Sequence, residues 1–350
     1  MLLRQRKLWY YTIDYLRRGL RIFKEFNEIT MIKLRRLLYI TTMLTAVLFL
    51  CTGCSNEREE KQMQLREQGI TYLENGQYEE ALEAFQGALD ESLGEIGEVE
   101  VDICYYKAEA QYMSGDVEGA IATYTAIIGY NHAPKAYYLR GNLYYSKNDE
   151  EAALKDYASA AEYDNQTDYE LYIGIYEAMK AHDNTNGTDY LDKALNIKGE
   201  TAYDKMQKGR IKFFLGIYGD AVTMLEEAAA GKEYEAYYYL SEVHLATNDM
   251  EKAQNNMNAY ITSGVADSYK LYNIAETQLI KGNYAISISC LEAALKLETV
   301  PNKQIVMKTL AIAYEKTSNF VAARDILTDY VKLYPEDEEA KRELTFLETR

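Results

Sequence analysis

GITYLENGQYEEALEAFQGA, residues 69–88, is the stretch that decides the fold of this chain. It places a small residue, Gly69, ahead of a second glycine, Gly76, and continues with alanines on either side of Phe85. A glycine such as Gly76 favours the left-handed backbone that ends a helix. A small residue lets two helices approach closely where they cross, and a large ring fills the remaining hole. The stretch therefore predicts two helices that are joined by a tight turn and packed together.

The same arrangement recurs along the chain. Small residues follow one another at spacings of 39, 33, 33, 35, 32, 34 and 36 residues, which gives eight units. They are Gly69, Ala108, Gly141, Gly174, Gly209, Ser241, Ala275 and Ala311. Only three prolines occur in 350 residues, as expected for a chain that is almost wholly helical. A period near 34 residues indicates an array of helix-turn-helix repeats.

These units resemble the tetratricopeptide repeat. The resemblance rests on the first unit and is supported by matching residues in three others: Gly141, Tyr144, Ala153, Tyr157 and Ala160; Gly209, Gly216, Tyr218, Ala221, Leu225 and Ala228; Ala311, Tyr314, Phe320, Ala323, Leu327 and the closing Pro335. It implies an all-α fold, a right-handed superhelical solenoid of about eight repeats. Gly115, Gly216 and Gly282 are expected, with Gly76, at the turns between paired helices.

The array is expected over residues 62–335. Its repeats are expected at about 62–95, 101–134, 134–167, 167–201, 202–235, 234–267, 268–301 and 304–337. A C-terminal capping helix is expected at 336–350, because Glu336–Glu339 place negative charge on its first turn and Ala340, Leu344 and Leu347 form an apolar stripe.

Two places depart from the pattern. The fourth unit has an extra residue in its turn, 182–189, and keeps only Leu191 and Ala194 clearly, so its second helix is the least regular. Five extra residues, with Gly94 and Gly97 among them, separate the first two units. A hinge and a protruding loop are both consistent with that insertion.

Residues 1–53 have the pattern of an export leader. Lys33, Arg35 and Arg36 precede the apolar run Leu37–Leu50, whose 14 residues would span only about 21 Å as a helix. A hydrocarbon core is roughly 30 Å thick, so a permanent membrane span is disfavoured. Residues 1–30 fit neither a signal nor a repeat, which suggests that translation starts at Met31.

Thr52-Gly53-Cys54 resembles the lipobox of bacterial lipoproteins. The resemblance implies cleavage before Cys54, a lipid on its thiol and a short linker at 54–61. Cys51 stands where that family usually has leucine, and an uncleaved signal anchor is the alternative. The Cys-x-x-Cys spacing of Cys51 and Cys54 also occurs in zinc sites, but no second cysteine or histidine pair completes one.

The charge of the chain excludes some partners and favours others. The net charge is −17, and residues 1–53 carry ten Lys/Arg against three Asp/Glu, so the remainder carries −24. Such an acidic surface repels nucleic acid and anionic lipid head groups. A basic protein or peptide is the natural complement.

Catalytic and metal-binding motifs are missing from the sequence. The three histidines, His132, His182 and His244, are far apart, and no phosphate loop or nucleophile elbow is present. Residues 183–189 resemble a calcium loop only superficially, because Ala194 stands where a bidentate glutamate belongs. Cys104 and Cys290 are expected to be free, buried thiols. We expect no enzyme activity, no cofactor and no metal.

In the tetratricopeptide family the first helices of successive repeats line a groove. The expected groove residues here are Tyr105, Tyr112, Tyr138, Asn142, Tyr145, Arg210, Phe213, Tyr238 and Tyr272. Such aromatic side chains suit contact with an extended or helical peptide, although they suit packing between helices equally well. Lys135 and the other cations are scattered, so no carboxylate clamp is evident. Glu109, Glu242 and Glu276 favour a ligand that carries lysine or arginine.

The sequence thus predicts a membrane-anchored scaffold or adaptor that binds other proteins at the extracytoplasmic face of a bacterial cell envelope. The alternative is a structural subunit of an envelope assembly or secretion complex.

Overall fold

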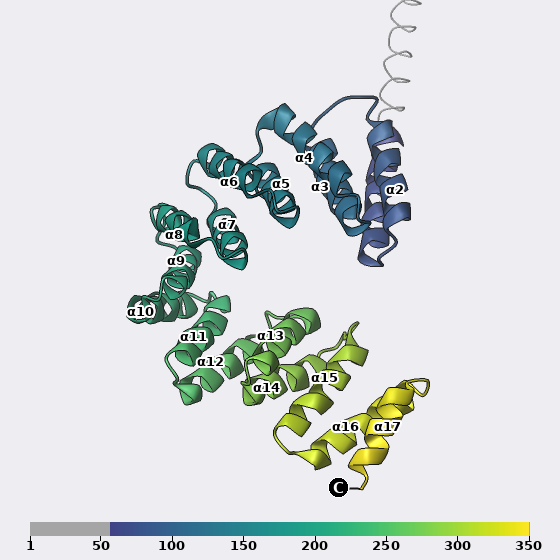
Figure 1. Ribbon diagram of the computed structural model, residues 1–350, viewed down its shortest axis with the longest axis vertical. Coiled ribbons are helices and arrows are strands. Elements are labelled where there is room, and N and C mark those ends of the chain that lie inside the picture. The colour runs from purple at the N-terminus through teal and green to yellow at the C-terminus, as the bar shows by residue number, and fades with distance from the viewer. Residues whose placement is uncertain (1–56, 350) are drawn as a thin grey trace, which may run out of the picture. The chain divides into compact units, whose positions relative to one another are not determined.

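The computed structural model describes residues 57–349, and the regular secondary structure of this part is helical (Figure 1). The chain divides into two compact units between His132 and Ala133. The first unit contains a helix at 57–74, α2 (Tyr78–Glu91), α3 (Glu98–Met113) and α4 (Val117–Asn131).

The second unit contains thirteen α-helices and one 3-10 helix, η1. They are α5 (Pro134–Ser146), α6 (Glu150–Asp164), α7 (Tyr169–Ala181), η1 (Thr185–Gly187), α8 (Thr188–Leu195), α9 (Ala202–Phe214), α10 (Tyr218–Ala230), α11 (Glu235–Ala246), α12 (Met250–Ser263), α13 (Ser268–Ile280), α14 (Tyr284–Leu295), α15 (Lys303–Lys316), α16 (Phe320–Leu333) and α17 (Glu338–Leu347).

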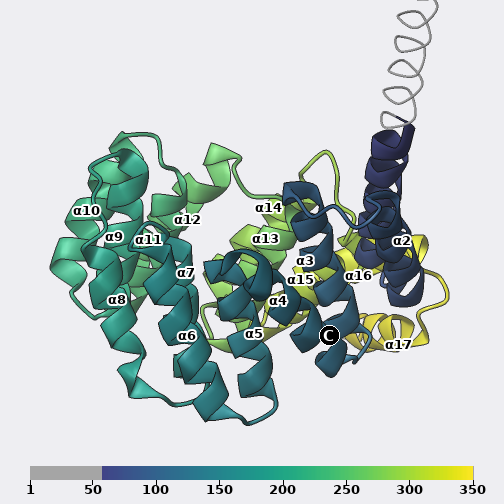
Figure 2. The same cartoon turned by 90° about the horizontal axis from the view of Figure 1, so that it is seen from above.

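Consecutive helices form antiparallel pairs, of which residues 57–349 hold eight, followed by α17 (Figure 2). The first pair is the helix at 57–74 with α2, and the last is α15 with α16. The expected all-α array of about eight helix-turn-helix repeats is therefore confirmed. Within each unit, successive pairs bury one face against each other, as in the cluster of Met257, Leu271 and Cys290 between α12, α13 and α14.

Each of the eight turns contains one residue with left-handed backbone. Four are the glycines expected at turns, with φ between +74° and +90°. The other four are Asn148, Asp183, Asn248 and Ser318, with φ between +58° and +60°. The turns share their hydrogen bonding: the Gly282 N–H donates to the Leu279 carbonyl at 3.1 Å, and the Ser318 N–H donates to the Glu315 carbonyl at 2.9 Å.

Three of the predicted glycines lie where the helices of one pair cross. A Cβ added to Gly69 would lie 2.6 Å from the ring of Phe85, and one added to Gly141 would lie equally close to the ring of Tyr157. Gly209 is related to Leu225 in the same way, at 2.7 Å. The assignment of Gly174 to such a crossing is wrong. Its nearest neighbour would be the hydroxyl of Tyr138 on α5, because α7 turns Gly174 toward the preceding pair.

The second helix of the fourth pair is the shortest α-helix of the array. The polar turn at 183–184 leads into η1, and α8 is only eight residues long. It keeps Leu191 and Ala194 fully buried, as its sequence predicts. Within residues 57–349, no group of three or more His, Cys, Asp and Glu side chains is placed to hold a metal ion.

The expected linker at 54–61 needs a correction, because residues 57–61 already belong to the first helix. The run from Glu57 to Gln68 contains strong helix formers and neither glycine nor proline. Packing also holds its start: Lys61 pairs with Glu91 at 2.5 Å, and the Gln62 amide donates to Glu100 at 2.6 Å.

The array ends in the expected capping helix, α17. The Asp337 carboxylate accepts the N–H of Ala340 at 3.0 Å and so caps the first turn. Ala340 and Leu347 pack against the α15–α16 pair at Leu327 and Tyr330. The leader at 1–53, the lipobox and Cys54 lie outside the described residues. In the part that is described, no helix is both long enough and apolar enough to span a bilayer.

Candidate functional site

The expected groove residues differ in exposure. Tyr112 is exposed, and most of the others are half-buried, namely Tyr105, Tyr138, Asn142, Phe213, Tyr238 and Tyr272. Tyr145 is only 3% exposed, and the Arg210 side chain is also largely buried. Tyr105 and Tyr112 belong to the first unit and the other seven to the second.

Around α5 the aromatic residues serve the packing of helices. Tyr145 stacks on the imidazole of His182 with ring centroids 4.4 Å apart, and it also touches Tyr157. The Tyr157 hydroxyl donates to the side-chain oxygen of Asn142 at 2.5 Å. Tyr138 packs against Tyr157 and covers Gly174. The prediction that Tyr145 lines an open groove is therefore wrong, because His182 covers its ring.

Arg210 organises a polar cluster on three successive first helices, α7, α9 and α11. Its guanidinium donates to both carboxylate oxygens of Glu170, at 3.0 and 2.9 Å, and lies 3.6 Å from Glu177. The same group lies over the rings of Phe214 and Tyr239. Burial tends to lower the pKa of Arg210, but the Tyr239 hydroxyl and the two glutamates raise it overall, so the side chain stays charged.

Gln207 completes this Arg210 cluster. Its amide nitrogen donates to Glu170 at 2.6 Å and to the Tyr203 hydroxyl at 2.9 Å. The cluster fixes α7 against α9 and leaves one face of Glu170 and Glu177 exposed. Phe213 lies beside the Arg210 cluster, and its ring centroid is 5.5 Å from that of Phe214.

The two glutamates expected in the second unit's groove have different roles. Glu242 is buried and accepts from Gln278 at 2.6 Å and from Lys281 at 3.2 Å, so it links α11 to α13 and cannot meet a ligand. Glu276 is exposed and accepts from the Tyr272 hydroxyl at 3.2 Å. Of the two, only Glu276 fits the expectation of an accessible carboxylate.

A stripe of side chains, all of them exposed except the half-buried Tyr272, runs along α13 and α15, which are the first helices of the last two pairs. We define the C-terminal stripe as Tyr269, Tyr272, Glu276 and Ile280 of α13 together with Ile305 and Ile312 of α15. Spacings of three, four and seven residues place each set on one helix face. Ile280 is 81% exposed and Tyr269 is 53% exposed. The helices α13 and α15 touch, and Tyr269 and Ile305 stand at equivalent positions, six residues before Ala275 and Ala311.

Sequence reasoning found only Tyr272 and Glu276 of this stripe. Tyr269, Ile280 and Ile305, which lie six residues before or five after a small residue, were not among the expected groove residues. The other members of the Arg210 cluster, Glu170, Glu177 and Gln207, were not expected either. Their signal in the sequence is a seven-residue spacing of glutamates, which is too common on helices to be specific.

Burial affects the two described cysteines and His244 to different degrees. Burial raises the pKa of the Cys290 thiol to about 12, and Cys290 is free, as predicted. Cys104 is also free but half-buried, so its predicted burial is only partial. His244 has its pKa lowered, mainly by burial, and stands apart from the other two histidines.

The succession of paired helices shows that this is a helical repeat protein. Some of its side chains are exposed and available for contact with other molecules. Residues 66–134, 107–169 and 272–338 match the family model described as Tetratricopeptide repeat. The chain therefore carries tetratricopeptide repeats, and the helices α7 to α12, which lie in the unmatched stretch 170–271 apart from the first residue of α7, continue the same pairing. Repeats of this type generally mediate contacts between proteins, and the fold is typically a non-catalytic scaffold.

Solved structures with a similar arrangement include a tetratricopeptide repeat protein from Parabacteroides merdae, with 13% identity and a TM-score of 0.44 over 73% of this chain and 99% of that one. The C-terminal part of a repeat protein from Cytophaga hutchinsonii has 15% identity and a TM-score of 0.38 over 80% and 99%. PilW, a type IV pilus biogenesis factor, has 13% identity and a TM-score of 0.37 over 60% and 98%. No curated protein matches the sequence.

Proposed function

We propose that this protein is a scaffold that binds other proteins and is held at the extracytoplasmic face of a bacterial membrane by a lipid on Cys54. The observation that carries the binding role is the C-terminal stripe. Four of its apolar side chains are exposed in a regular order on two adjacent helices, namely Tyr269, Ile280, Ile305 and Ile312. Exposed apolar side chains that gather on one face mark interaction surfaces more often than isolated ones do.

The stripe suits a partner of particular chemistry. Each apolar side chain that a partner fully covers there contributes on the order of 1–2 kcal/mol of binding free energy. Glu276, in the middle of the stripe, provides an exposed carboxylate for a lysine or arginine of the partner. We therefore expect a helical or extended segment with apolar side chains around one basic residue.

The anchor is proposed from the leader alone. The basic residues from Lys33 to Arg36, the apolar run Leu37–Leu50 and the lipobox ending at Cys54 occur in the order that export and lipidation require. The rest of the chain is acidic, so it is not attracted electrostatically to an anionic membrane surface. A covalent lipid is therefore the expected means of attachment.

The test is chemical crosslinking on intact native cells, followed by purification of this protein and mass spectrometry of the chains attached to it. The stripe variant is Ile280→Ser with Ile312→Ser. The matched control is Met250→Ser with Val321→Ser, which removes two exposed apolar side chains from the second helices α12 and α16. We expect a partner that the wild type and the control capture and that the stripe variant loses.

The same partners in all three samples would refute binding at the stripe. A partner that stays with every variant in fixed proportion through purification would instead favour the alternative, a structural subunit of an envelope assembly.

A further inference from the structure

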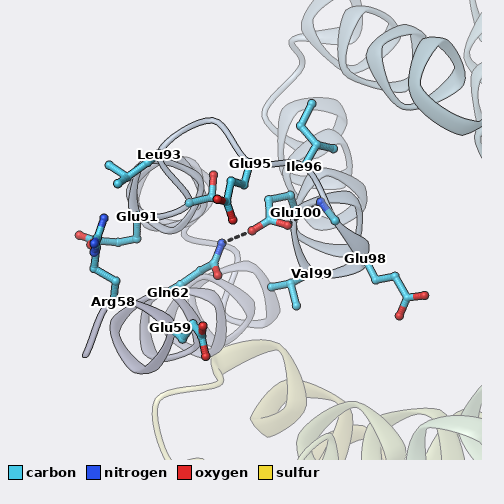
Figure 3. A pocket seen from close by; sticks show the side chains of 12 residues that line it. Arg58, Glu59, Gln62, Glu91, Leu93, Glu95, Ile96, Glu98, Val99 and Glu100 are labelled. Atoms are coloured by element: carbon cyan, nitrogen blue, oxygen red, sulfur yellow. Dashed lines mark hydrogen bonds between the residues drawn. The ribbon is translucent and has the colours of Figure 1, made fainter. Parts of the chain in front are cut away.

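An open pocket of about 630 Å³ lies at the start of the first unit (Figure 3). Its walls are the first turns of the helix at 57–74, the C-terminal end of α2, the connecting loop 92–97 and the first turn of α3. The loop lies at the place where five extra residues separate the first two repeats. The insertion therefore builds a feature that the regular repeat does not have.

Apolar side chains stand exposed around this pocket. Leu93 is 72% exposed, Ile96 is 59% exposed, and Val99 is also exposed. Leu93 has φ +55°, a left-handed conformation that a bulky residue rarely adopts. The Tyr130 hydroxyl donates to the Ile96 carbonyl at 3.0 Å and fixes the far end of the loop. The loop thus keeps these apolar side chains exposed to water, although the exposure of apolar surface to water is unfavourable.

The residues that line the pocket are predominantly acidic. Five glutamates and a single arginine, Arg58, line it. Glu100 receives the Gln62 amide at 2.6 Å and the Gly97 N–H at 2.8 Å, and these bonds keep it in place as part of the floor. In the described part of the chain, no cation pairs with Glu59, Glu95 or Glu98, and all three are exposed. Figure 3 shows Glu95 and Ile96 on the loop beside Glu100.

We propose that this pocket binds a segment of a partner protein in which lysine or arginine side chains alternate with apolar ones. Exposed carboxylates and exposed aliphatic side chains are mixed within one concave site, so neither a purely apolar nor a purely basic ligand matches it. A basic side chain would neutralise Glu95 or Glu98, and its apolar neighbours would cover Leu93 and Ile96.

The place of this segment follows from the proposed function. Arg58 is four residues after Cys54, and four residues span at most about 14 Å. If Cys54 carries the lipid, the pocket lies next to the membrane surface. The partner is then a membrane protein, and the segment is one that lies close to its membrane-spanning part.

The experiment measures fluorescence anisotropy of a labelled peptide in which leucine and lysine alternate, titrated with the full chain in detergent. The charge variant is Glu95→Lys with Glu98→Lys, and the apolar variant is Leu93→Ser with Ile96→Ser. Glu74→Lys with Glu83→Lys is the matched control, because both residues are exposed on the first pair and neither lines the pocket. Helical circular dichroism and the midpoint of thermal unfolding check that every variant is folded.

We expect the charge variant and the apolar variant each to raise the Kd at least about 10-fold, and the control to stay within about twofold. Replacing the lysines of the peptide by glutamate, or its leucines by serine, should have a similar effect. The stripe variant, Ile280→Ser with Ile312→Ser, should bind the peptide as the wild type does, so failure at the stripe and failure at the pocket are distinguishable.

Three results would overturn the proposal. Equal weakening by the charge variant and its control would mean that the peptide senses only the general acidity of the chain. In a second result, a synthetic peptide of residues 31–50 would displace the labelled peptide at a lower concentration than the unlabelled leucine–lysine peptide does. That result would identify the chain's own leader as the occupant of the pocket. Self-association that the pocket variants abolish, seen by analytical ultracentrifugation, would identify a second copy.

Discussion

At the scale of single residues, the fold depends on what surrounds each small side chain. Two contrasting kinds of helical glycine occur in residues 57–349. Gly69, Gly141 and Gly209 face a large side chain of the partner helix within 3 Å of where a Cβ would be, whereas Gly219 has nothing within 4 Å. The first kind is required by packing, and the second only lowers the helix propensity of its segment.

This difference predicts opposite effects of one substitution. Gly141→Ala would press a methyl group against the fully buried ring of Tyr157, at 2.6 Å, and near the Ala153 carbonyl, at 3.3 Å. We expect it to lower the free energy of unfolding by about 1–3 kcal/mol. Gly219→Ala should raise it by about 0.5 kcal/mol, because helix propensity alone changes. Thermal unfolding followed by circular dichroism measures both, and a loss of stability in Gly219→Ala equal to that in Gly141→Ala would contradict this explanation.

At the scale of helices and turns, the sequence predicts the pairs but only half of the turn residues. Glycine is a reliable signal for left-handed backbone, and all four predicted turn glycines have it. The sequence does not predict the left-handed backbone of the other four turn residues, because asparagine, aspartate and serine are equally common at helix N-termini. These four are Asn148, Asp183, Asn248 and Ser318. The candidate site is less predictable than the fold. Spacing places Tyr145 on the first helix, but its burial depends on His182, which belongs to the next repeat.

The two kinds of turn can be exchanged in a test. Gly282 and Ser318 hold the same place in successive pairs, with φ +82° and +60°. Nothing lies within 4 Å of a Cβ on Gly282, so the effect of substitution there is conformational. Gly282→Ala should cost about 1 kcal/mol of stability, and Ser318→Gly should add about 0.5 kcal/mol, since the gain is reduced by the greater freedom of glycine in the unfolded chain. Urea unfolding midpoints that shift in the same direction would refute this reading.

The capping helix α17 should respond to acid. A hydrogen bond from the Tyr330 hydroxyl, at 2.7 Å, holds the pKa of the Asp337 carboxyl well below its usual range, and the Ala340 N–H and Lys308 add to the effect. Because this pKa is depressed on folding, its contribution to stability is complete above the unfolded value, about 3.9, and is lost as the pH falls below it. We expect α17 to lose protection against hydrogen exchange below about pH 4.

Asp337→Asn separates this effect from the titration of other carboxylates. Asparagine still caps the helix but cannot ionise, so α17 should be less protected at pH 7 and should show a weaker dependence on pH. Protection factors, which correct for the intrinsic rate of exchange, provide the measurement. An unchanged pH dependence in the variant would show that Asp337 is not the responsible group.

At the scale of the whole molecule, the distribution of charge separates the leader from the repeats. Residues 1–53 have a balance of +7, and the remaining chain carries −24. An acidic body of this kind is repelled by anionic lipids, and the described helices include no membrane span. Surface electrostatics therefore cannot hold the repeats at a membrane, and the proposed attachment depends on residues before Glu57.

Two cysteines that are three residues apart allow the attachment to be tested. If Cys54 is acylated, cells grown with labelled palmitate should yield a labelled protein that lacks residues 1–53, and Cys54→Ala should be unlabelled and uncleaved. Cys51→Ala is the matched control: it removes a thiol from the leader, upstream of the proposed cleavage, and should leave label and cleavage unchanged. High salt should not release the wild type from membranes, because salt weakens only electrostatic attachment, whereas detergent should. Equal labelling of the wild type and Cys54→Ala would exclude Cys54 as the site of acylation, and an uncleaved, unlabelled wild type would identify Leu37–Leu50 as a signal anchor.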